Sequence, residues 1–253
     1  MKRVVTGDLR QRLFDSHFHI IDPRFPLIPN QGYLPSVYTI ADYQVATANF
    51  NVIGGAVVSG SFQGFDQRYL VAALMELGPG FVGVIQLPAT ASDVQILELD
   101  EIGVRAVRFN LFRGGSEGIE RLEEMARRVF DLAGWHVELY VNARDLPDLS
   151  SRLLTLPRVS IDHLGLSREG LPYLLKLAEQ GVYVKATGFG RGDLNVPETL
   201  RALYQANPGS LIFGTDLPST RAPRPFVASD VALILDTLGA EASQQVLFEN
   251  AYT

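Results

Sequence analysis

The sequence predicts an α/β protein that folds as a single (β/α)8 TIM barrel, and three observations carry this prediction. Eight short apolar segments alternate with segments of helical pattern along the 253 residues. Strands that alternate with helices form a parallel sheet through right-handed crossovers. Several of the apolar segments end in a polar residue, as strands do at the active-site mouth of a barrel. The length suits one barrel, so we expect one domain over residues 1–253 with a loose tail at 1–11.

The predicted strands are short apolar runs bounded by turn residues. Residues 52–59 form a continuous apolar run with glycines, which is typical of a strand buried on both faces of a parallel sheet. The predicted strands cover residues 12–18, 52–59, 81–87, 103–110, 135–142, 159–163, 182–188 and 211–216.

A helix is predicted after each strand. Thr39 is a suitable N-cap for the first helix, and 118–133 has the best amphipathic pattern. Residues 20–38 form a long Pro-rich connection, a type of loop that is often a functional lid. The alternative fold is an open doubly wound sheet, but the glycines at 114–118 lack the spacing of a dinucleotide or phosphate loop. The predicted helices cover residues 39–50, 65–78, 91–101, 118–133, 145–155, 169–180 and 197–206, with one or two more within 229–251.

Charge and composition exclude several classes of protein. The net charge of −6 and the pI near 5.3 argue against a nucleic-acid-binding or anionic-membrane surface. The chain has no cysteine, which excludes disulfides and thiolate metal sites. There is neither an apolar run of about 20 residues nor an apolar signal segment. We therefore expect a cytoplasmic protein with a small-molecule partner; the oligomeric state stays open.

Three of the four histidines and one carboxylate close predicted strands. His17 and His19 are one residue apart at the end of the first strand, so alternation directs both imidazoles to the same side. His163 closes the sixth strand and Asp216 the eighth. A single His-x-His pair is a weak signal, but its repetition at strand ends predicts a catalytic site. His136 opens its strand and is interpreted as structural.

Other polar residues extend this predicted site. Arg108 is chosen over Arg105 because it lies nearer the end of its strand. Arg191 and Tyr33 are loop residues that can reach the same mouth. The remaining polar residues at predicted strand ends are Ser59, Gln86, Asn110, Tyr140, Asn142 and either Lys185 or Thr187.

Three further charged residues receive structural interpretations. Asp15 shares the parity of His17, and a carboxylate buried there would need a partner such as Lys185 or an imidazole. Asp162 is expected to point away from the site. Lys185 is interpreted as a member of a buried ion pair rather than as a Schiff-base nucleophile.

The motifs resemble those of the amidohydrolase superfamily, in the branch called amidohydrolase family 2, and within it the lactonase group that contains 2-pyrone-4,6-dicarboxylate lactonase. The resemblance spans residues 13–218 in family order and implies a barrel fold. The matching segments are Asp15-Ser16-His17-Phe18-His19, Gly103 to Asn110, Gly134-Trp135-His136-Val137, Ile161-Asp162-His163-Leu164-Gly165 and Gly214-Thr215-Asp216-Leu217-Pro218.

The resemblance implies a role for each candidate residue. His17, His19 and His163 would surround and polarise the reacting carbonyl, and Asp216 would activate water. Arg108 and Arg191 would bind acid or hydroxyl groups of the substrate, with Tyr33, Ser59 and Tyr140 lining the pocket. Leu166 and Gly114 replace two basic residues of the group, with Arg113 one step before Gly114. Fewer fixed cations predict an anionic lactone with one carboxylate rather than two.

The same resemblance bears on metal and on competing functions. Metal-dependent members have a ligand at the end of strand five, where this chain has Tyr140-Val141-Asn142, so no cofactor is expected. If Zn or Mn is bound, the ligands would be His17, His19, His163 and Asp216. We expect a carboxylated-lactone hydrolase; sugar-lactone hydrolysis, lactone isomerisation and metal-dependent decarboxylation stay open. The presence of the base Asp216 disfavours a non-catalytic binding barrel.

Overall fold

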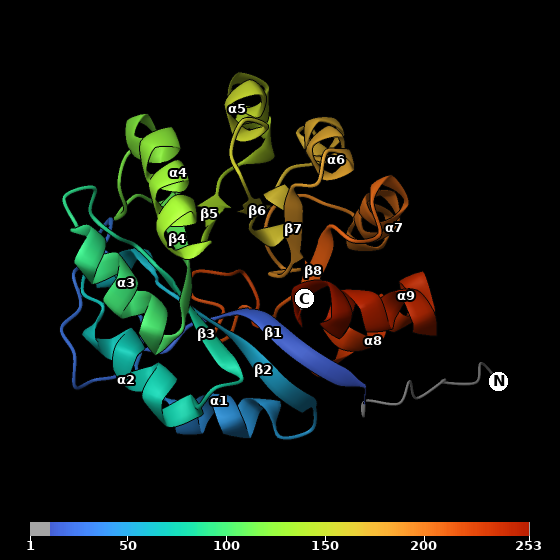
Figure 1. Ribbon diagram of the computed structural model, residues 1–253. Coiled ribbons are helices and arrows are strands. Elements are labelled where there is room, and N and C mark those ends of the chain that lie inside the picture. Colours follow the sequence, from blue (N-terminus) through green and yellow to red (C-terminus); the bar gives the residue numbers. More distant parts are fainter. Residues whose placement is uncertain (1–10, 253) are drawn as a thin grey trace.

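The computed structural model describes residues 11–252 and contains an eight-stranded parallel sheet that curls into a barrel (Figure 1). The strands neighbour one another in chain order, which confirms the predicted (β/α)8 architecture. They are β1 (Arg12–Phe18), β2 (Asn51–Val58), β3 (Phe81–Ile85), β4 (Val104–Asn110), β5 (His136–Tyr140), β6 (Val159–Ile161), β7 (Tyr183–Ala186) and β8 (Leu211–Phe213). The extent of the domain stays a prediction, since residues 1–10 and 253, including most of the expected tail, lie outside the described residues.

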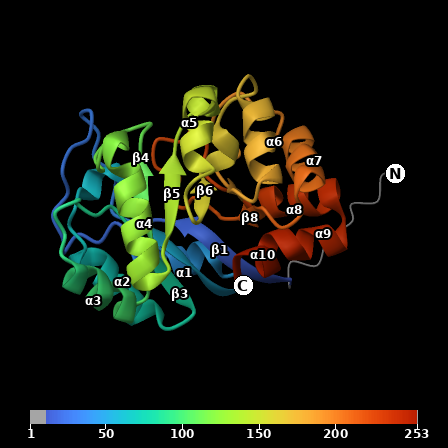
Figure 2. The same cartoon turned by 45° about the horizontal axis from the view of Figure 1, so that its top comes forward.

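The helices surround the strands (Figures 1 and 2). Thr39 caps α1 as predicted: its hydroxyl accepts from the amide of Asp42, whose carboxylate accepts from the amide of Thr39. The helices are α1 (Ile40–Thr47), α2 (Arg68–Leu77), α3 (Asp93–Ile102), α4 (Leu122–Ala133), α5 (Leu146–Leu153), α6 (Leu171–Glu179), α7 (Val196–Ala206), α8 (Ala228–Leu238), α9 (Ala240–Gln244) and α10 (Asn250–Tyr252), with a π-helical turn at Gln245–Glu249.

The strands end earlier than the sequence predicted, and the difference matters for the site. β6 ends at Ile161 and β8 at Phe213, so His163 and Asp216 lie two and three residues beyond the ladder. Both residues have a left-handed backbone, with φ of 52° and 62°, which a β-strand does not tolerate. His163 and Asp216 therefore belong to the turns that follow β6 and β8.

The junction between β8 and β1 is closed by the backbone near the site. The amide of Asp216 donates to the carbonyl of His17 at 2.7 Å, and the amide of His19 donates to the carbonyl of Leu217 at 2.7 Å. Gly214 allows this approach, because a Cβ at that position would lie 2.7 Å from the amide nitrogen of His17. The first and last strands thus bring His17, His19 and Asp216 together although about 200 residues separate them.

Apolar and polar layers divide the barrel interior. Ala56, Val58, Val84 and Ala106 form a small buried cluster inside the barrel, whereas the large apolar side chains pack between the strands and the helices. Burial of these apolar side chains between the strands and the helices stabilises the fold. Buried polar side chains occupy the part of the interior nearest the C-terminal strand ends.

The long first loop is ordered by two antiparallel bridges, Ile21 with Tyr38 and Asn30 with Tyr33. Within residues 11–252, none of the helices combines the length and the apolar character needed to cross a bilayer. The expected cytoplasmic location stays a prediction.

Candidate active site

The structure brings the four predicted catalytic residues together. Nε2 of His19 lies 3.9 Å from Oδ1 of Asp216, and Nε2 of His163 lies 4.0 Å from the same oxygen. The ring of His17 is centred 5.1 Å from that of His19 and 4.9 Å from that of His163. All four side chains are buried. Oδ1 of Asp216 has no hydrogen-bond partner, so an acceptor oxygen and two imidazole nitrogens face a common point.

Hydrogen bonds determine what His19 and His163 can donate. Nδ1 of His19 lies 2.7 Å from the carbonyl of Val58; because a carbonyl only accepts, Nδ1 carries the hydrogen. Burial, aided by the neighbouring His17, holds the pKa of His19 well below its usual value. The neutral ring therefore has a lone pair and no hydrogen at Nε2, which differs from the expected role of His19 in polarising a carbonyl.

His163 has a different partner. Its Nδ1 lies 2.6 Å from Oγ1 of Thr187, a hydroxyl that can donate to it. Burial, with Arg191 nearby, holds the pKa of His163 well below its usual value. In the tautomer in which Thr187 donates to Nδ1, Nε2 of His163 carries a hydrogen and can polarise a carbonyl.

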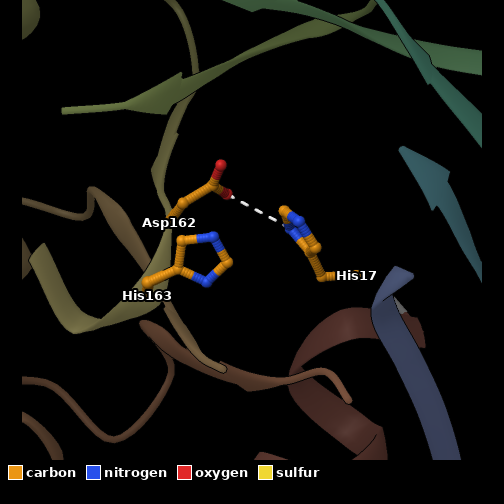
Figure 3. A group of neighbouring side chains, drawn as sticks. All are labelled: His17, Asp162 and His163. Atoms are coloured by element: carbon orange, nitrogen blue, oxygen red, sulfur yellow. Dashed lines mark ion pairs between the residues drawn. The ribbon is translucent and has the colours of Figure 1, made fainter. Parts of the chain in front are cut away.

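His17 lies beneath these two imidazoles and contacts two carboxylates. Its Nδ1 is 3.4 Å from Oδ1 of Asp162 (Figure 3). The same nitrogen is 3.6 Å from Oε1 of Glu138. Burial lowers the pKa of His17 to about 3, despite the nearby charge of Asp162. The expectation that Asp162 points away from the site is wrong. Asp162 keeps the extended backbone of β6 and points toward His17, and the left-handed turn that also directs His163 into the site begins one residue later.

Glu138 is a buried carboxylate that the sequence analysis did not single out. It shares the face of Tyr140 on β5, so strand alternation was the signal that could have found it. Burial raises the pKa of Glu138 to about 7, although Lys185 and Arg108 oppose the rise. Lys185 forms an ion pair with Glu138 and donates to the carbonyl of Ser16 at 2.7 Å. The prediction that Lys185 belongs to a buried ion pair is confirmed.

Arg108 borders a small cavity at the mouth and is also held by protein groups. Its guanidinium donates to Asp162 and to the carbonyl of Ser59, each at 2.6 Å. Burial opposes ionisation of Asp162, but Arg108 and His17 together hold its pKa well below the usual value. The predicted substrate-binding residue thus serves first as the counter-ion of Asp162.

Asp15 differs from the prediction because β1 contains an irregularity. The pairing with β2 shifts between Asp15 and Phe18, so simple alternation with His17 fails. Asp15 accepts hydrogen bonds from Tyr43 at 3.0 Å and from the amide and hydroxyl of Thr215, each at 2.7 Å. The expected partners, Lys185 or an imidazole side chain, are replaced by neutral donors that join β1 to the segment carrying Asp216.

Backbone strain concentrates at the site. His163, Leu164 and Leu166 have φ between 52° and 67°, and Asp216 has φ of 62°. Such conformations cost about 1–3 kcal/mol for a residue other than glycine and persist where the surroundings enforce them. No local pattern in the sequence predicts them.

The other predicted residues are divided between the cavity and its surroundings. Arg191 donates from Nε to Oδ2 of Asp216 at 2.7 Å. Tyr140 packs edge-on against His163, 4.9 Å between ring centres. The hydroxyl of Ser59 instead forms a hydrogen bond of 2.7 Å with the hydroxyl of Tyr69 of α2, so its side chain does not line the pocket as predicted.

The guanidinium of Arg221 lies 4.4 Å from the ring centre of Tyr33. His136 lies at the opposite end of the barrel, where it lines a separate cavity.

Two adjoining cavities form the mouth of the barrel. A small cavity of about 30 Å³ is bordered by His19, His163 and Arg108. A larger, more open cavity of about 350 Å³ lies outside it. The two share four lining residues: Arg113, Tyr140, Arg191 and Arg221. Arg221 was not predicted, because it follows β8 in a segment without strand or helix pattern.

The donor atoms at the site also fit a divalent metal. Ligand atoms of His17, His19 and Asp216 lie within 4.8 Å of one another, and so do those of His17, Asp162 and His163. The predicted ligand set is therefore split between two overlapping groups. Imidazole nitrogens and a carboxylate suit Zn²⁺ or Mn²⁺. In both groups, however, the carboxylate already has an arginine as its counter-ion.

Comparisons with known proteins agree with this fold and identify a family. The amidohydrolase family profile matches residues 14–253. The 2-pyrone-4,6-dicarboxylate hydrolase of Comamonas testosteroni is 28% identical over 269 residues, covering 93% of this chain and 87% of that protein. The 4-sulfomuconolactone hydrolase of Rhizobium radiobacter is 26% identical over 228 residues, covering 81% and 75%. A solved structure from Agrobacterium tumefaciens has a TM-score of 0.85 at 22% identity, covering 96% and 94%, and supports the fold.

Proposed function

The chain belongs to the amidohydrolase family, and from this premise we propose that it hydrolyses the ester bond of an anionic lactone. The observation that carries the proposal is the unpartnered Oδ1 of Asp216, which faces Nε2 of His19 and of His163. Two relatives that align with most of this chain are named as hydrolases of a pyrone dicarboxylate and of a sulfonated lactone. A lactone provides the carbonyl and the leaving alkoxide that these groups can serve.

Asp216 is the proposed general base. Burial raises its pKa above the usual value, and the Arg191 guanidinium opposes this rise, so the carboxylate is a stronger base than a free aspartate. Arg191 holds Oδ2 and leaves Oδ1 for water. Nε2 of His19 accepts the second hydrogen of that water and orients its lone pair toward the carbonyl carbon.

The remaining steps use the same residues. As the water oxygen bonds to the carbonyl carbon, its proton moves to Asp216 and the developing oxyanion accepts the Nε2 hydrogen bond of His163. Collapse of this intermediate breaks the ring C–O bond. Protonated Asp216 returns its proton to the leaving alkoxide, which gives the hydroxy acid. His17 positions the site from below through its contacts with Asp162 and Glu138.

We propose that this reaction does not require a metal. A divalent ion, when bound, would be held by His17, His19 and Asp216 and would polarise the carbonyl as a Lewis acid. Arg191 and Arg108 already neutralise the two carboxylates of the candidate metal groups. Their charges also lower the pKa of His19, after the larger effects of burial and His17, so the local field disfavours additional positive charge.

A panel of neutral and carboxylated lactones in H₂¹⁸O tests the proposal. We expect proton release with anionic lactones and incorporation of one ¹⁸O atom into the hydroxy acid product. Asp216→Asn serves as the inactive control. Conversion of a lactone without ¹⁸O uptake would identify an isomerase, and release of CO₂ from a non-lactone acid would identify a decarboxylase.

A further inference from the structure

A cavity of about 420 Å³ opens at the N-terminal end of the barrel, opposite the mouth that holds the candidate active site. All eight strands contribute to its lining, so this N-terminal cavity lies along the barrel axis. The interior of a (β/α)8 barrel is normally filled by layers of bulky branched side chains. Here the lining includes the small residues Ser16, Ala56 and Ser160, which leave part of that space open. The volume is within the range of small-molecule pockets.

The charged residues that line the N-terminal cavity are all basic. Arg105 belongs to β4, His136 opens β5, Arg158 precedes β6 and Lys185 belongs to β7. None of the described lining residues is acidic, although the chain carries a net charge of −6. Burial, with the charges of Lys185 and Arg158, lowers the pKa of His136 to about 3. The electrostatic field in this cavity is therefore positive and favours an anion.

Arg158 differs from the other two permanent cations of the lining. Arg105 pairs with Asp100 at 2.8 Å, and Lys185 pairs with Glu138. Arg158 forms no salt bridge with an acidic side chain of residues 11–252. It is exposed at the opening of the cavity, so its guanidinium is free to bind an anion that enters.

A hydroxyl deeper in the cavity also lacks a partner. Oγ of Ser160 is buried and forms no hydrogen bond, which is unfavourable for a polar atom inside a protein. Ser16, which lines the same cavity, instead donates its hydroxyl to the carbonyl of Phe213. Ser160 lies two residues after Arg158, so strand alternation directs both side chains to the same side. One ligand oxygen group can therefore meet both.

The other half of the lining is apolar. Phe14 of β1, Val82 and Val84 of β3 and Ile212 of β8 border the cavity there. The basic residues come from β4 to β7 and the large apolar residues from β8, β1 and β3. Because the strands neighbour one another in chain order, the basic half and the apolar half face each other across the barrel axis.

We propose that the N-terminal cavity is a second ligand site, which binds a small acid with an apolar ring or short chain. The carboxylate would accept hydrogen bonds from the Arg158 guanidinium and the Ser160 hydroxyl, since guanidinium groups match a carboxylate with paired N–H donors. The apolar part would pack against Phe14, Val82 and Ile212. The buried pair of Lys185 and Glu138 lies between this cavity and His17, so the ligand is separate from the substrate at the mouth.

Calorimetric titration with phenylacetate, phenylacetamide and acetate tests the proposed chemistry. Phenylacetate has both the charge and the ring, whereas the amide lacks the charge and acetate lacks the ring. We expect phenylacetate to bind at least about tenfold more tightly than either, a difference of about 1.4 kcal/mol. Equal affinity for the three compounds, or absence of phenylacetate binding, contradicts the site.

Methyl NMR locates the bound acid. Phenylacetate should shift the methyl signals of Val82, Val84 and Ile212 in the N-terminal cavity. Leu166 lines the larger cavity at the mouth and reports any binding there. Shifts confined to Leu166 would show that the acid occupies only the mouth and would overturn the proposal.

Two variants test the residues that would hold the carboxylate. Arg158→Gln, at an exposed position, should weaken phenylacetate binding in the N-terminal cavity by about tenfold or more. Arg201→Gln removes an exposed arginine of α7 outside the cavity and is the matched control, with an unchanged Kd. Ser160→Val removes the unpartnered hydroxyl and fills part of the cavity, so it should weaken binding while the melting temperature is kept or raised. Wild-type affinity in either Arg158→Gln or Ser160→Val would contradict the proposal. None of these measurements depends on lactone hydrolysis.

Discussion

The inner and outer parts of the mouth differ in how their charges are balanced. In the inner cluster three buried carboxylates have cations: Asp162 pairs with Arg108, Glu138 with Lys185 and with Arg108 at 3.4 Å, and Asp216 with Arg191. Asp15 is the exception and has only neutral donors. On the outer rim, Arg113 and Arg221 have no carboxylate partner within residues 11–252. An ion pair buried inside the protein is complete before any ligand arrives, whereas cations that are left unpaired are completed by one. The inner cluster therefore has its charges balanced without a ligand, and the outer rim does not.

The largest effect is expected at Asp216, whose Oδ1 faces Nε2 of His19 and of His163. Asp216→Asn keeps the shape of the side chain but removes its ability to take a proton from water. We expect kcat to fall by about 100- to 10,000-fold, the usual contribution of a general base. Steady-state kinetics measures the loss, and circular dichroism of the same sample verifies the fold. A variant that is folded and turns over at the wild-type rate would place the base elsewhere.

Breaking an inner ion pair should affect stability next most strongly. Lys185→Met leaves Glu138 buried with Arg108, 3.4 Å away, as its remaining cation, and we expect the free energy of unfolding to fall by about 3 kcal/mol. Guanidinium denaturation measures the change. The double variant Lys185→Met, Glu138→Leu should recover most of the loss, because it removes the buried carboxylate as well. A loss below about 1 kcal/mol in the single variant would contradict the description of a buried pair.

The carboxylate of Asp15 gives a pH-dependent test of the inner region. Burial raises its pKa from 3.8 to about 6, although hydrogen bonds from Thr215 oppose the rise. A folded-state pKa above the unfolded value favours the protonated fold, so this group stabilises fully below pH 3.8 and the contribution is lost as the pH rises through 6. The expected loss is on the order of 3 kcal/mol, from about 1.4 kcal/mol for each pKa unit.

Denaturant unfolding of the wild type and of Asp15→Asn at pH 4 to 7 measures this effect. The advantage of the wild type over the variant should shrink as the pH rises, since the asparagine does not ionise. Titration of the buried histidines is present in both proteins and cancels in the difference. An advantage that grows with pH would show that the fold prefers the charged carboxylate.

The sequence predicted the barrel and the convergence of His17, His19, His163 and Asp216, because both follow from the alternation of strands and helices and from strand polarity. It misplaced Asp162 and Asp15, because a turn after β6 and an irregularity in β1 break the two-residue period on which those predictions depended. Arg221 was not found because its position depends on contacts between loops, with Asn30 and Tyr33, that no periodic pattern encodes.

Removal of metal should have the smallest effect on activity. A divalent ion between His17, His19 and Asp216 would lie close to the Arg191 guanidinium, which is 2.7 Å from Asp216. Like unit charges about 4 Å apart repel by about 4 kcal/mol at the effective dielectric constant of a protein, so the inner cluster opposes the ion that its donor atoms would otherwise accept. We expect the protein to keep most of its kcat/KM after treatment with a chelator and desalting, and elemental analysis to find less than one metal ion per chain. Activity that is lost on chelation and restored by one equivalent of Zn²⁺ or Mn²⁺ would show that the lone pairs of His17 and His19 outweigh the nearby arginines.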